Sequence, residues 1–450
     1  MSFVKRFQNS LGSLYVPPKN SKYVIAYSGG LDSHVLLHCF KQLDVAVRAV
    51  HVHHGLQAVA DDWVNHCMQS CAQLGIQLDI LYVDAKQKPG TSPEEAARDA
   101  RYQALHDNLV KDECLVTAQH LDDQAETLLL QLFRTASSAG LSAMPAYKKF
   151  GDHVHIRPLL SFSRGDIEKY AKENHLQWVE DLSNQDTAFD RNYLRKEILP
   201  LLEKRWPEVS ARLAKVAEMQ SSNLQVLQDM AAIDLANAIS TQESPLKACV
   251  YEVVSKLSIN RLQQLSSARL LNLLRYWVMT MLDQQPTRNL LEEIEKTLIN
   301  SQQDAIPEII FSDYLFRKFQ GNIYLLRISD TQGLQANPEW NPSSPITISE
   351  LNIQIKAVDS VGVGLHRDLL NETLTIRSRV GGEKFHPAGR RHSQSLKKLL
   401  QEANIPPWER DVLPFLYFAD ELIAVGGLWV CKRYSVDSGE SGWLVDIELI

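Results

Sequence analysis

The residues best placed to do chemistry form a short loop of small and polar side chains. The loop joins an apolar run to an apolar helical pattern, and its residues are Ser28, Gly29, Gly30, Leu31, Asp32 and Ser33. A strand, a tight loop and a helix in this order aim backbone N–H groups at one point, where the helix dipole adds positive charge. The two glycines let the backbone approach a ligand closely, and Asp32 or Ser33 is expected to cap the helix. The loop therefore predicts a phosphate site.

Acidic side chains gather in a second segment, 117–127, where a predicted strand runs into a helix. Asp122 and Glu126 lie one helical turn apart, and Asp123 is adjacent to the first of them. Carboxylates in this position could hold Mg²⁺ or accept a proton from a substrate. Capping of the helix N-terminus, which acids favour, is an alternative that accounts for one of the three.

Arginines in two predicted helices form a third group. Arg98 and Arg101 share one helix face, and a solvated basic stripe is the alternative to a binding role. Arg191 lies near the start of its helix, which is the unfavourable end for a cation and therefore indicates an anionic partner. Pairing within that helix, with Asp190 or Glu197, is the plain alternative.

Five apolar strand candidates alternate with helical patterns and must position these residues. They span 23–27, 46–52, 78–83, 114–118 and 154–156. The alternation predicts a parallel sheet covered on both faces, with ligands beyond the carboxyl ends of the strands. The serine-glycine loop and the acidic segment follow such ends, and so does a loop with His54 and Gly55. We expect that loop to face the ligand, because no Cys or carboxylate follows His51 and His53 at a spacing suited to zinc.

The rest of the chain predicts two further modules. From about 205 to 300 the Leu- and Ala-rich pattern is helical throughout, and a hairpin over 311–328 closes this module. A Pro- and Ser-rich linker follows, and the last hundred residues mix strands with a helix at 395–403. The predicted domains are 1–205, 206–330 and 351–450, with the linker at 331–350.

The last module carries a concentration of positive charge. Between 377 and 398 only Glu383 is acidic, whereas the cations are Arg377, Arg379, Lys384, Arg390, Arg391, Lys397 and Lys398. Three glycines in the same stretch would let the backbone approach phosphates. Although a solvated loop is the alternative, this imbalance in an acidic protein favours contact with nucleic acid.

Composition limits the class of protein. The chain has 450 residues, 22% of them charged and 44% hydrophobic, with a net charge of −7, which argues against a general nucleic-acid coat protein. No run of eighteen apolar residues and no signal peptide are present, so we expect no membrane association and a cytoplasmic location. The six cysteines form no CxxC pair, which fits reduced thiols.

Several strings together identify a family. SGGLDS matches the signature of the PP-loop ATP pyrophosphatases, and the ordered set that follows it resembles the tRNA(Ile)-lysidine synthase family along nearly the whole chain. That set consists of HVHHGL, ARDARY, HLDDQAET, RPLL, WVEDLSNQD, RNYLR, RVGGEKFHPAGR, LKKLLQE and PPWER. The resemblance implies an α/β fold with a parallel sheet of the PP-loop ATPase (adenine nucleotide alpha hydrolase-like) type. A helical domain and a small mixed α/β C-terminal domain would follow it.

The activity that the resemblance implies is an AMP-forming ligation. Members join free L-lysine to C2 of the wobble cytidine of tRNA(Ile) with anticodon CAU, through an adenylated cytidine, using ATP and Mg²⁺. The product, lysidine, changes decoding from AUG to AUA and tRNA identity from methionine to isoleucine. No obligate protein partner is evident.

The family motifs also imply roles for residues. Ser28 to Ser33, with His54 and Gly55, would bind ATP; Asp32, Asp122, Asp123 and Arg191 would be catalytic. Of these, Asp32 and Asp123 would lie near Mg²⁺, Arg191 near phosphate or adenylate oxygens, and Asp122 with Glu126 near the lysine amine. The tRNA contacts would be Arg98, Arg101, Arg379, Lys384, Arg390, Arg391, Lys397 and Lys398. The family usually has glycines where this chain has Thr135, Ala136 and Ser137, so a close backbone approach there is not expected.

Rival functions make different demands on the sequence. Thiolating PP-loop enzymes would use cysteines in CxxC pairs, and amidotransferases would carry an N-terminal nucleophilic cysteine; this chain has neither. An NAD-synthesising ligase would not need the basic C-terminal segment. A tRNA-binding module with a decayed ATP loop is the rival from another class, and the intact SGGLDS string with the acidic segment argues against it.

Overall fold

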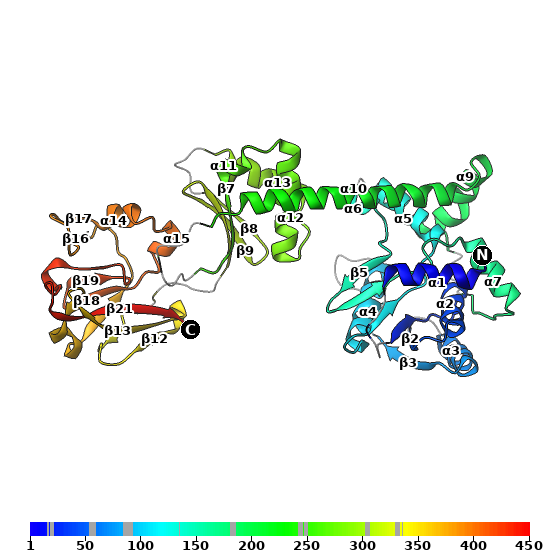
Figure 1. Cartoon of the computed structure of the whole chain (residues 1–450), viewed down its shortest axis with the longest axis horizontal. Helices are drawn as coiled ribbons and strands as arrows, with labels where there is room; N and C mark the ends of the chain where they lie inside the picture. The colour runs from blue at the N-terminus through cyan, green and yellow to red at the C-terminus, as the bar shows by residue number, and fades with distance from the viewer. Residues whose placement is uncertain are drawn as a thin grey trace. The chain divides into compact units, whose positions relative to one another are not determined.

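The computed structural model of the chain divides into two compact units, residues 1–227 and 228–450. Figure 1 shows their elements in chain order. The structure describes residues 1–15, 18, 22–53, 60–83, 93–134, 136–180, 186–241, 246, 251–301, 307–328, 334 and 336–450. His54, Gly55 and Thr135 lie outside the described residues.

The first unit is built on a six-stranded sheet in the order β3-β2-β1-β4-β6-β5. Its strands are β1 Tyr23–Ala26, β2 Val47–His53, β3 Gln77–Tyr82, β4 Cys114–Val116, β5 Tyr147–Phe150 and β6 His153–Ile156. The five strands that the sequence predicts run parallel, as expected. The edge strand β5 was not predicted, and it pairs antiparallel with β6.

Helices cover both faces of this sheet, which confirms the prediction of a doubly covered α/β domain. Tyr23 and Ile25 point into the larger core with α1, α2, α3 and α7, whereas the intervening Val24 packs on the other face with Leu105 of α4 and with Leu109, which follows that helix. The helices are α1 Phe3–Leu14, α2 Leu31–Gln42, α3 Ala60–Leu74, α4 Pro93–Asn108, α5 Leu121–Phe133, α6 Ser138–Leu141, α7 Arg164–Glu173, α8 Asp190–Tyr193, the π-helix η2 Leu194–Ile198, α9 Leu199–Arg205 and α10 Val209–Ala238.

The second unit begins with helices packed on a four-stranded antiparallel sheet. Trp277 and Phe316 meet edge to face in its core, with ring centroids 5.6 Å apart. The elements are β7 Val253–Ser258, α11 Ile259–Leu262, α12 Ser267–Leu282, α13 Arg288–Glu293, the π-helix η3 Ile294–Ile299, β8 Glu308–Phe311, β9 Tyr314–Phe319 and β10 Asn322–Arg327. The predicted hairpin is confirmed as β9 and β10.

One strand lies inside the stretch that the sequence predicts to be all helical. β7 pairs antiparallel with β10, with Leu257 opposite Ile323, and so completes the sheet order β7-β10-β9-β8. Its alternation of apolar and polar residues is short, and the helical patterns on both sides mask it.

The remainder of the second unit mixes short strands with helices, as predicted; the expected helix at 395–403 is α14, whereas the short α15 was not predicted. Its sheets are β11-β15-β18-β19-β20, β12-β13-β21-β14 and β16-β17. Within the segment predicted as a linker, Trp340 is buried against Trp443. The elements are β11 Glu339–Trp340, β12 Ile346–Ile348, β13 Ile353–Val361, β14 Leu365–His366, β15 Leu374–Arg377, β16 Lys384–Phe385, β17 Gln394–Ser395, α14 Leu396–Glu402, α15 Pro407–Arg410, β18 Phe415–Phe418, β19 Glu421–Val425, β20 Trp429–Val430 and β21 Ser441–Leu449, with 3-10 turns Ser349–Leu351, Arg367–Asn371 and Lys432–Tyr434.

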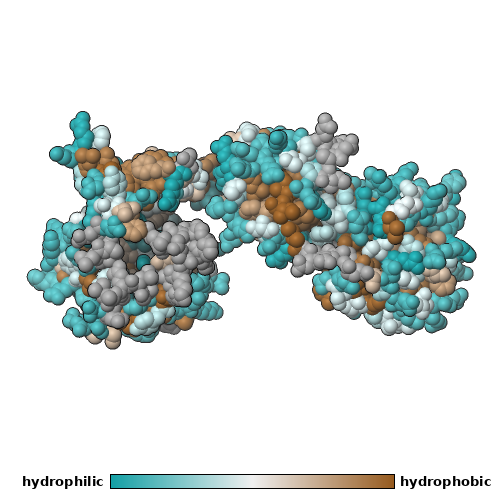
Figure 2. Space-filling model, turned by 180° about the vertical axis from the view of Figure 1, so that it is seen from behind, coloured by the Kyte–Doolittle hydropathy of each residue, from teal (hydrophilic) through white to brown (hydrophobic). Residues whose placement is uncertain are grey.

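Polar residues cover most of the face that Figure 2 shows. Among the helices that the structure describes, none combines the length and the apolar character needed to cross a bilayer.

Candidate active site

The serine-glycine loop enters α2 without a side-chain cap. Gly30 is the N-cap, so Asp32 and Ser33 lie in the first turn, and the expectation that one of them caps the helix is wrong. Ser33 instead closes the loop from within, because its hydroxyl donates to the Gly30 carbonyl (3.0 Å) and accepts from the N–H of Ser28 (3.2 Å). In the described part of the chain, nothing accepts from the N–H groups of Leu31 and Asp32. These groups are therefore available to a phosphate.

Close packing beneath the loop explains its first glycine. Gly29 has φ +83°, and a Cβ there would lie 2.9 Å from the Sγ of Cys67 on α3. Cys67 is fully buried, and burial raises the pKa of its thiol to about 12. A side chain at position 29 would push the loop away from α3.

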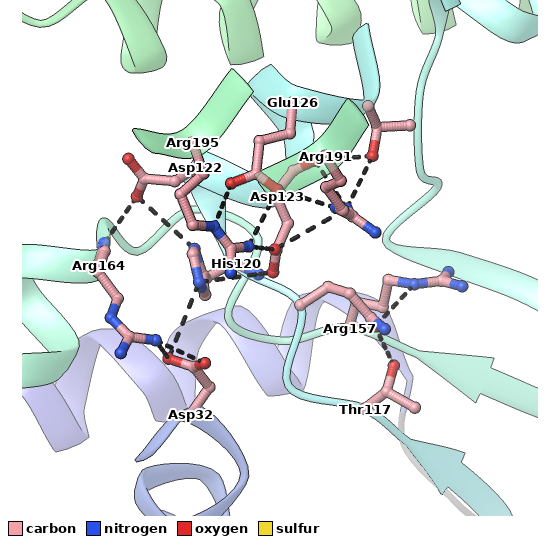
Figure 3. Close-up of polar contacts among 12 residues, drawn as sticks. Asp32, Thr117, His120, Asp122, Asp123, Glu126, Arg157, Arg164, Arg191 and Arg195 are labelled. Carbon is pink, nitrogen blue, oxygen red and sulfur yellow. Dashed lines mark hydrogen bonds and ion pairs between the residues drawn. The ribbon is translucent and has the colours of Figure 1, made fainter. Parts of the chain in front are cut away.

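His120 lies at the centre of three carboxylates. Its Nε2 is 3.8 Å from Asp32 and 3.5 Å from Asp123, and its Nδ1 is 3.6 Å from Asp122 (Figure 3). Burial by itself lowers the pKa of His120, but the adjacent carboxylates of Asp122, Asp123 and Asp32 outweigh it and raise the pKa. The imidazolium form therefore holds the loop aspartate and the start of α5 together.

Arg164 joins the same group from α7. Its Nη1 donates to both oxygens of Asp32 at 2.7 Å, and its backbone N–H donates to Asp122 at 2.7 Å. The position of Arg164 is fixed locally, since the Ser163 side chain caps α7 by accepting from the Asp166 N–H and the Asp166 carboxylate accepts from the Ser163 N–H. Although burial raises the pKa of Asp122, the contacts with His120 and the Arg164 N–H lower it overall.

Glu126 is completely buried and bound by two arginines. Arg191 Nε donates to it at 2.8 Å, and Arg195 Nε donates to its other oxygen at 2.6 Å. Arg195 also reaches Asp123 at 3.0 Å. The arginines of α8 and η2 thus pair across to α5, whereas the intrahelical pairing with Asp190 or Glu197 is not formed in the described structure. Both arginines remain partly exposed, with 29% and 39% of their side chains accessible.

The carboxylates offer a partial set of metal ligands. Asp32 and Asp123 approach the same imidazole nitrogen, so their oxygens face one region beside the loop. No group of three His, Cys, Asp or Glu side chains is arranged to hold a metal within the described ranges. Two carboxylates fit Mg²⁺ when phosphate oxygens and water complete its coordination.

The structure thus brings together the loop residues, Asp32, Asp122, Asp123, Glu126 and Arg191. His120, Arg164 and Arg195 also contact these carboxylates and are absent from the sequence-based assignment. His120 could have been found, because it directly precedes the acidic cluster at a strand end. Arg164 follows β6, another strand end, which was the signal for it.

The proposed tRNA-contacting residues lie elsewhere. Arg98 and Arg101 are exposed on α4. In the C-terminal module Arg390 pairs with Glu402 at 2.6 Å, and Lys398 is 3.9 Å from the same carboxylate. Arg379 lies 3.9 Å from Asp411. Of the predicted contacts in this module, three are exposed and have no acidic partner among the described residues: Lys384, Arg391 and Lys397.

Replacing His120 with glutamine is expected to lower the free energy of unfolding by an amount that depends on pH. Because the folded-state pKa lies above the unfolded value of about 6.5, the imidazolium stabilises the fold fully below about pH 6.5 and this contribution is lost as the pH rises through the raised pKa. Urea unfolding of the wild type and of His120→Gln, at pH values from below 6.5 upward, measures the difference in the free energy of unfolding. The exposed His175 in the same unit, changed to glutamine, is the control; a His120 effect that grows with pH would contradict the assignment.

Comparisons with known protein families and with individual relatives point to the same family over nearly the whole chain. Residues 3–202 match a family described as the PP-loop domain, 257–324 the TilS substrate binding domain and 374–448 the TilS substrate C-terminal domain. The tRNA(Ile)-lysidine synthase of Coxiella burnetii is 38% identical and covers 97% of this chain and 98% of its own length. That of Methylococcus capsulatus is 40% identical over 92% and 93%, and that of Serratia proteamaculans is 38% identical over 93% and 94%.

Proposed function

Because the chain belongs to the tRNA(Ile)-lysidine synthase family, we propose that its PP-loop unit joins free L-lysine to C2 of the wobble cytidine of tRNA(Ile) with anticodon CAU. It is an ATP-using ligase that forms lysidine, with AMP and pyrophosphate as the other products. The modification changes decoding from AUG to AUA and tRNA identity from methionine to isoleucine. The observation that carries this proposal is the group of three aspartates around His120, directly beside the serine-glycine loop.

In the first step the cytidine O2 attacks the α-phosphate of ATP and pyrophosphate leaves. The N–H groups of the loop bind the departing phosphates, and Ser33 keeps the loop in shape. Arg191, partly exposed and anchored on Glu126, offers its remaining N–H groups to phosphate or adenylate oxygens. Asp32 and Asp123 would hold a Mg²⁺ ion, whose charge offsets that of the pyrophosphate.

In the second step the lysine ε-amine attacks C2 and AMP leaves with its oxygen. Lysine arrives as an ammonium ion, so a carboxylate must take a proton before the amine can act as a nucleophile. We assign the acidic face of α5 to this amine. Asp122 is the partly exposed acid there, with 28% of its side chain accessible, whereas the buried Glu126 acts through its charge and the two arginines that it holds.

Transfer of label tests the function directly. The full chain is incubated with ATP, labelled lysine and tRNA(Ile) bearing CAU, and the tRNA is digested to nucleosides. Label in the wobble nucleoside, dependent on ATP, is the expected result. Label absent from the tRNA, or ATP/pyrophosphate exchange absent in its presence, would contradict the proposal and favour a non-catalytic tRNA-binding protein.

For the C-terminal module, we propose that the unpaired cations bind tRNA phosphates. Replacing Arg391 and Lys397 with glutamine is expected to weaken tRNA binding and to reduce the slope of log K against log salt by about 0.7–0.9 for each lost contact. Filter binding over a salt series measures both quantities. Arg390→Gln is the matched comparison, because Glu402 already neutralises Arg390 and the loss should be smaller; equal losses would contradict this reading.

A further inference from the structure

Three cations gather around the ring of Tyr102, away from the catalytic carboxylates. The Arg98 guanidinium lies 5.1 Å from the ring centroid, and the Lys148 ammonium lies 5.9 Å from it. Arg98 and Tyr102 are on α4, whereas Lys148 is on the edge strand β5 (Figure 1). Both cations are exposed. The third, Arg157, follows β6 and is almost completely buried.

Arg157 is held in place by neutral groups only. Its guanidinium donates to the Gln119 side chain at 3.1 Å, to the Pro145 carbonyl at 2.7 Å and to His155 Nδ1 at 3.4 Å. Thr117, which Figure 3 shows near Arg157, completes the ring of contacts, because its hydroxyl bonds His155 Nε2 at 2.7 Å and also the Gln119 side chain. His155 accepts from Arg157 and must therefore be neutral at that nitrogen.

The positive charges of the three cations affect the pKa of His155. Burial, followed by the charges of Arg157, Lys148 and Arg98, lowers the pKa of this histidine to about 2. In the described structure no carboxylate pairs with any of these three cations. A buried arginine without a counter-ion is costly unless a ligand supplies the negative charge, so the arrangement indicates a site for an anion.

We propose that Arg98 and Lys148, set against Tyr102 and supported from below by Arg157, bind phosphodiester groups of the tRNA substrate. Two exposed cations beside an aromatic ring suit a nucleic-acid backbone. Arg157 contacts Gln119, the residue before His120, so the cation group adjoins the carboxyl edge at which the chemistry takes place. The phosphates bound here are those close to the modified cytidine. This inference rests on the proposed function, and it adds Lys148, Tyr102 and Arg157 to the contacts expected of Arg98.

The test is tRNA affinity of the full chain in which Arg98 and Lys148 are both changed to glutamine. From counterion release, the loss of two contacts should weaken binding about 20- to 60-fold at about 0.1 M salt and reduce the log–log salt slope by about 1.4–1.8. Lys149→Gln is the matched control, because period two turns this neighbouring lysine of β5 to the other face of the sheet. The exchange variant R98K/K148R, which keeps both charges, should bind as the wild type does.

The possible outcomes distinguish a tRNA-binding site from a site for a small substrate. Unchanged tRNA affinity in R98Q/K148Q overturns the proposal, provided that the wild type transfers lysine to the tRNA. An unchanged Kd for tRNA with a raised KM for ATP or for lysine also overturns it, since the cations would then serve a phosphate or carboxylate of a small substrate. If the wild type binds tRNA but transfers no lysine, the proposed function fails while the binding comparison still decides the role of the two cations.

Discussion

Replacing Asp32 with alanine is expected to lower tRNA-dependent pyrophosphate release by about 100-fold or more. Both oxygens of the carboxylate accept from the Arg164 Nη1 at 2.7 Å, and the carboxylate is one of the three charges around His120. Its removal takes this acceptor from Arg164, which keeps Glu168, and one of three negative charges from His120, and it removes a candidate ligand for Mg²⁺. Single-turnover release of pyrophosphate, with saturating tRNA and ATP, measures the effect on the first chemical step.

Two comparisons make this result specific. The tRNA affinity of Asp32→Ala should be unchanged, because the proposed tRNA contacts lie elsewhere. Asp152→Ala, in the exposed turn that enters β6 at the opposite edge of the sheet, should release pyrophosphate normally. If D32A, D123A and R191A all released pyrophosphate at the wild-type rate, the assignment of these residues to catalysis would be wrong.

The positions of the main site residues could be predicted because they follow parallel strands. β1, β2 and β4 belong to apolar runs that can be found in the sequence, and the carboxyl ends of parallel strands must meet at one edge. Asp32 and Asp123 therefore had to lie close together. The same logic applies to β6 and Arg164, but that residue looked like part of an ordinary helix start behind the Ser163 cap.

What could not be predicted depends on contacts between distant segments. The pairing of Arg191 with Glu126 joins α8 to α5 across 65 positions, and no local pattern distinguishes it from an intrahelical pair. β5 and β7 are short strands whose place is set by their neighbours rather than by their own propensity. The raised pKa of His120 likewise follows from three carboxylates that only the fold brings together.

Replacing Glu126 with glutamine is expected to have the largest effect on local stability. The carboxylate is fully buried; its Oε1 accepts from Arg195, and its Oε2 accepts from both Arg191 and Arg195. Removing one partner of a buried ion pair typically costs about 3–5 kcal/mol; because Arg191 and Arg195 are partly exposed, we expect the lower figure, about 3 kcal/mol. Hydrogen exchange of amides in α5 and α8 should therefore become about 100-fold faster.

Glu126→Gln should also slow pyrophosphate release. We expect this effect because Glu126 positions Arg191 and Arg195, not because it contacts the substrate. Without the charge of Glu126, Arg191 and Arg195 lose the buried acceptor that they share. Asp123 still attracts Arg195 at 3.0 Å and Arg191 at 3.8 Å, and Arg191 keeps its bond to the Thr127 hydroxyl. Glu197→Gln is the control, because this acid is exposed on η2 and its loss should change stability by no more than about 0.5 kcal/mol. If Glu126→Gln exchanged its amides as slowly as the wild type, the buried carboxylate would not be the anchor of the two arginines. Slow exchange with lost activity would instead mean that Glu126 meets the substrate itself.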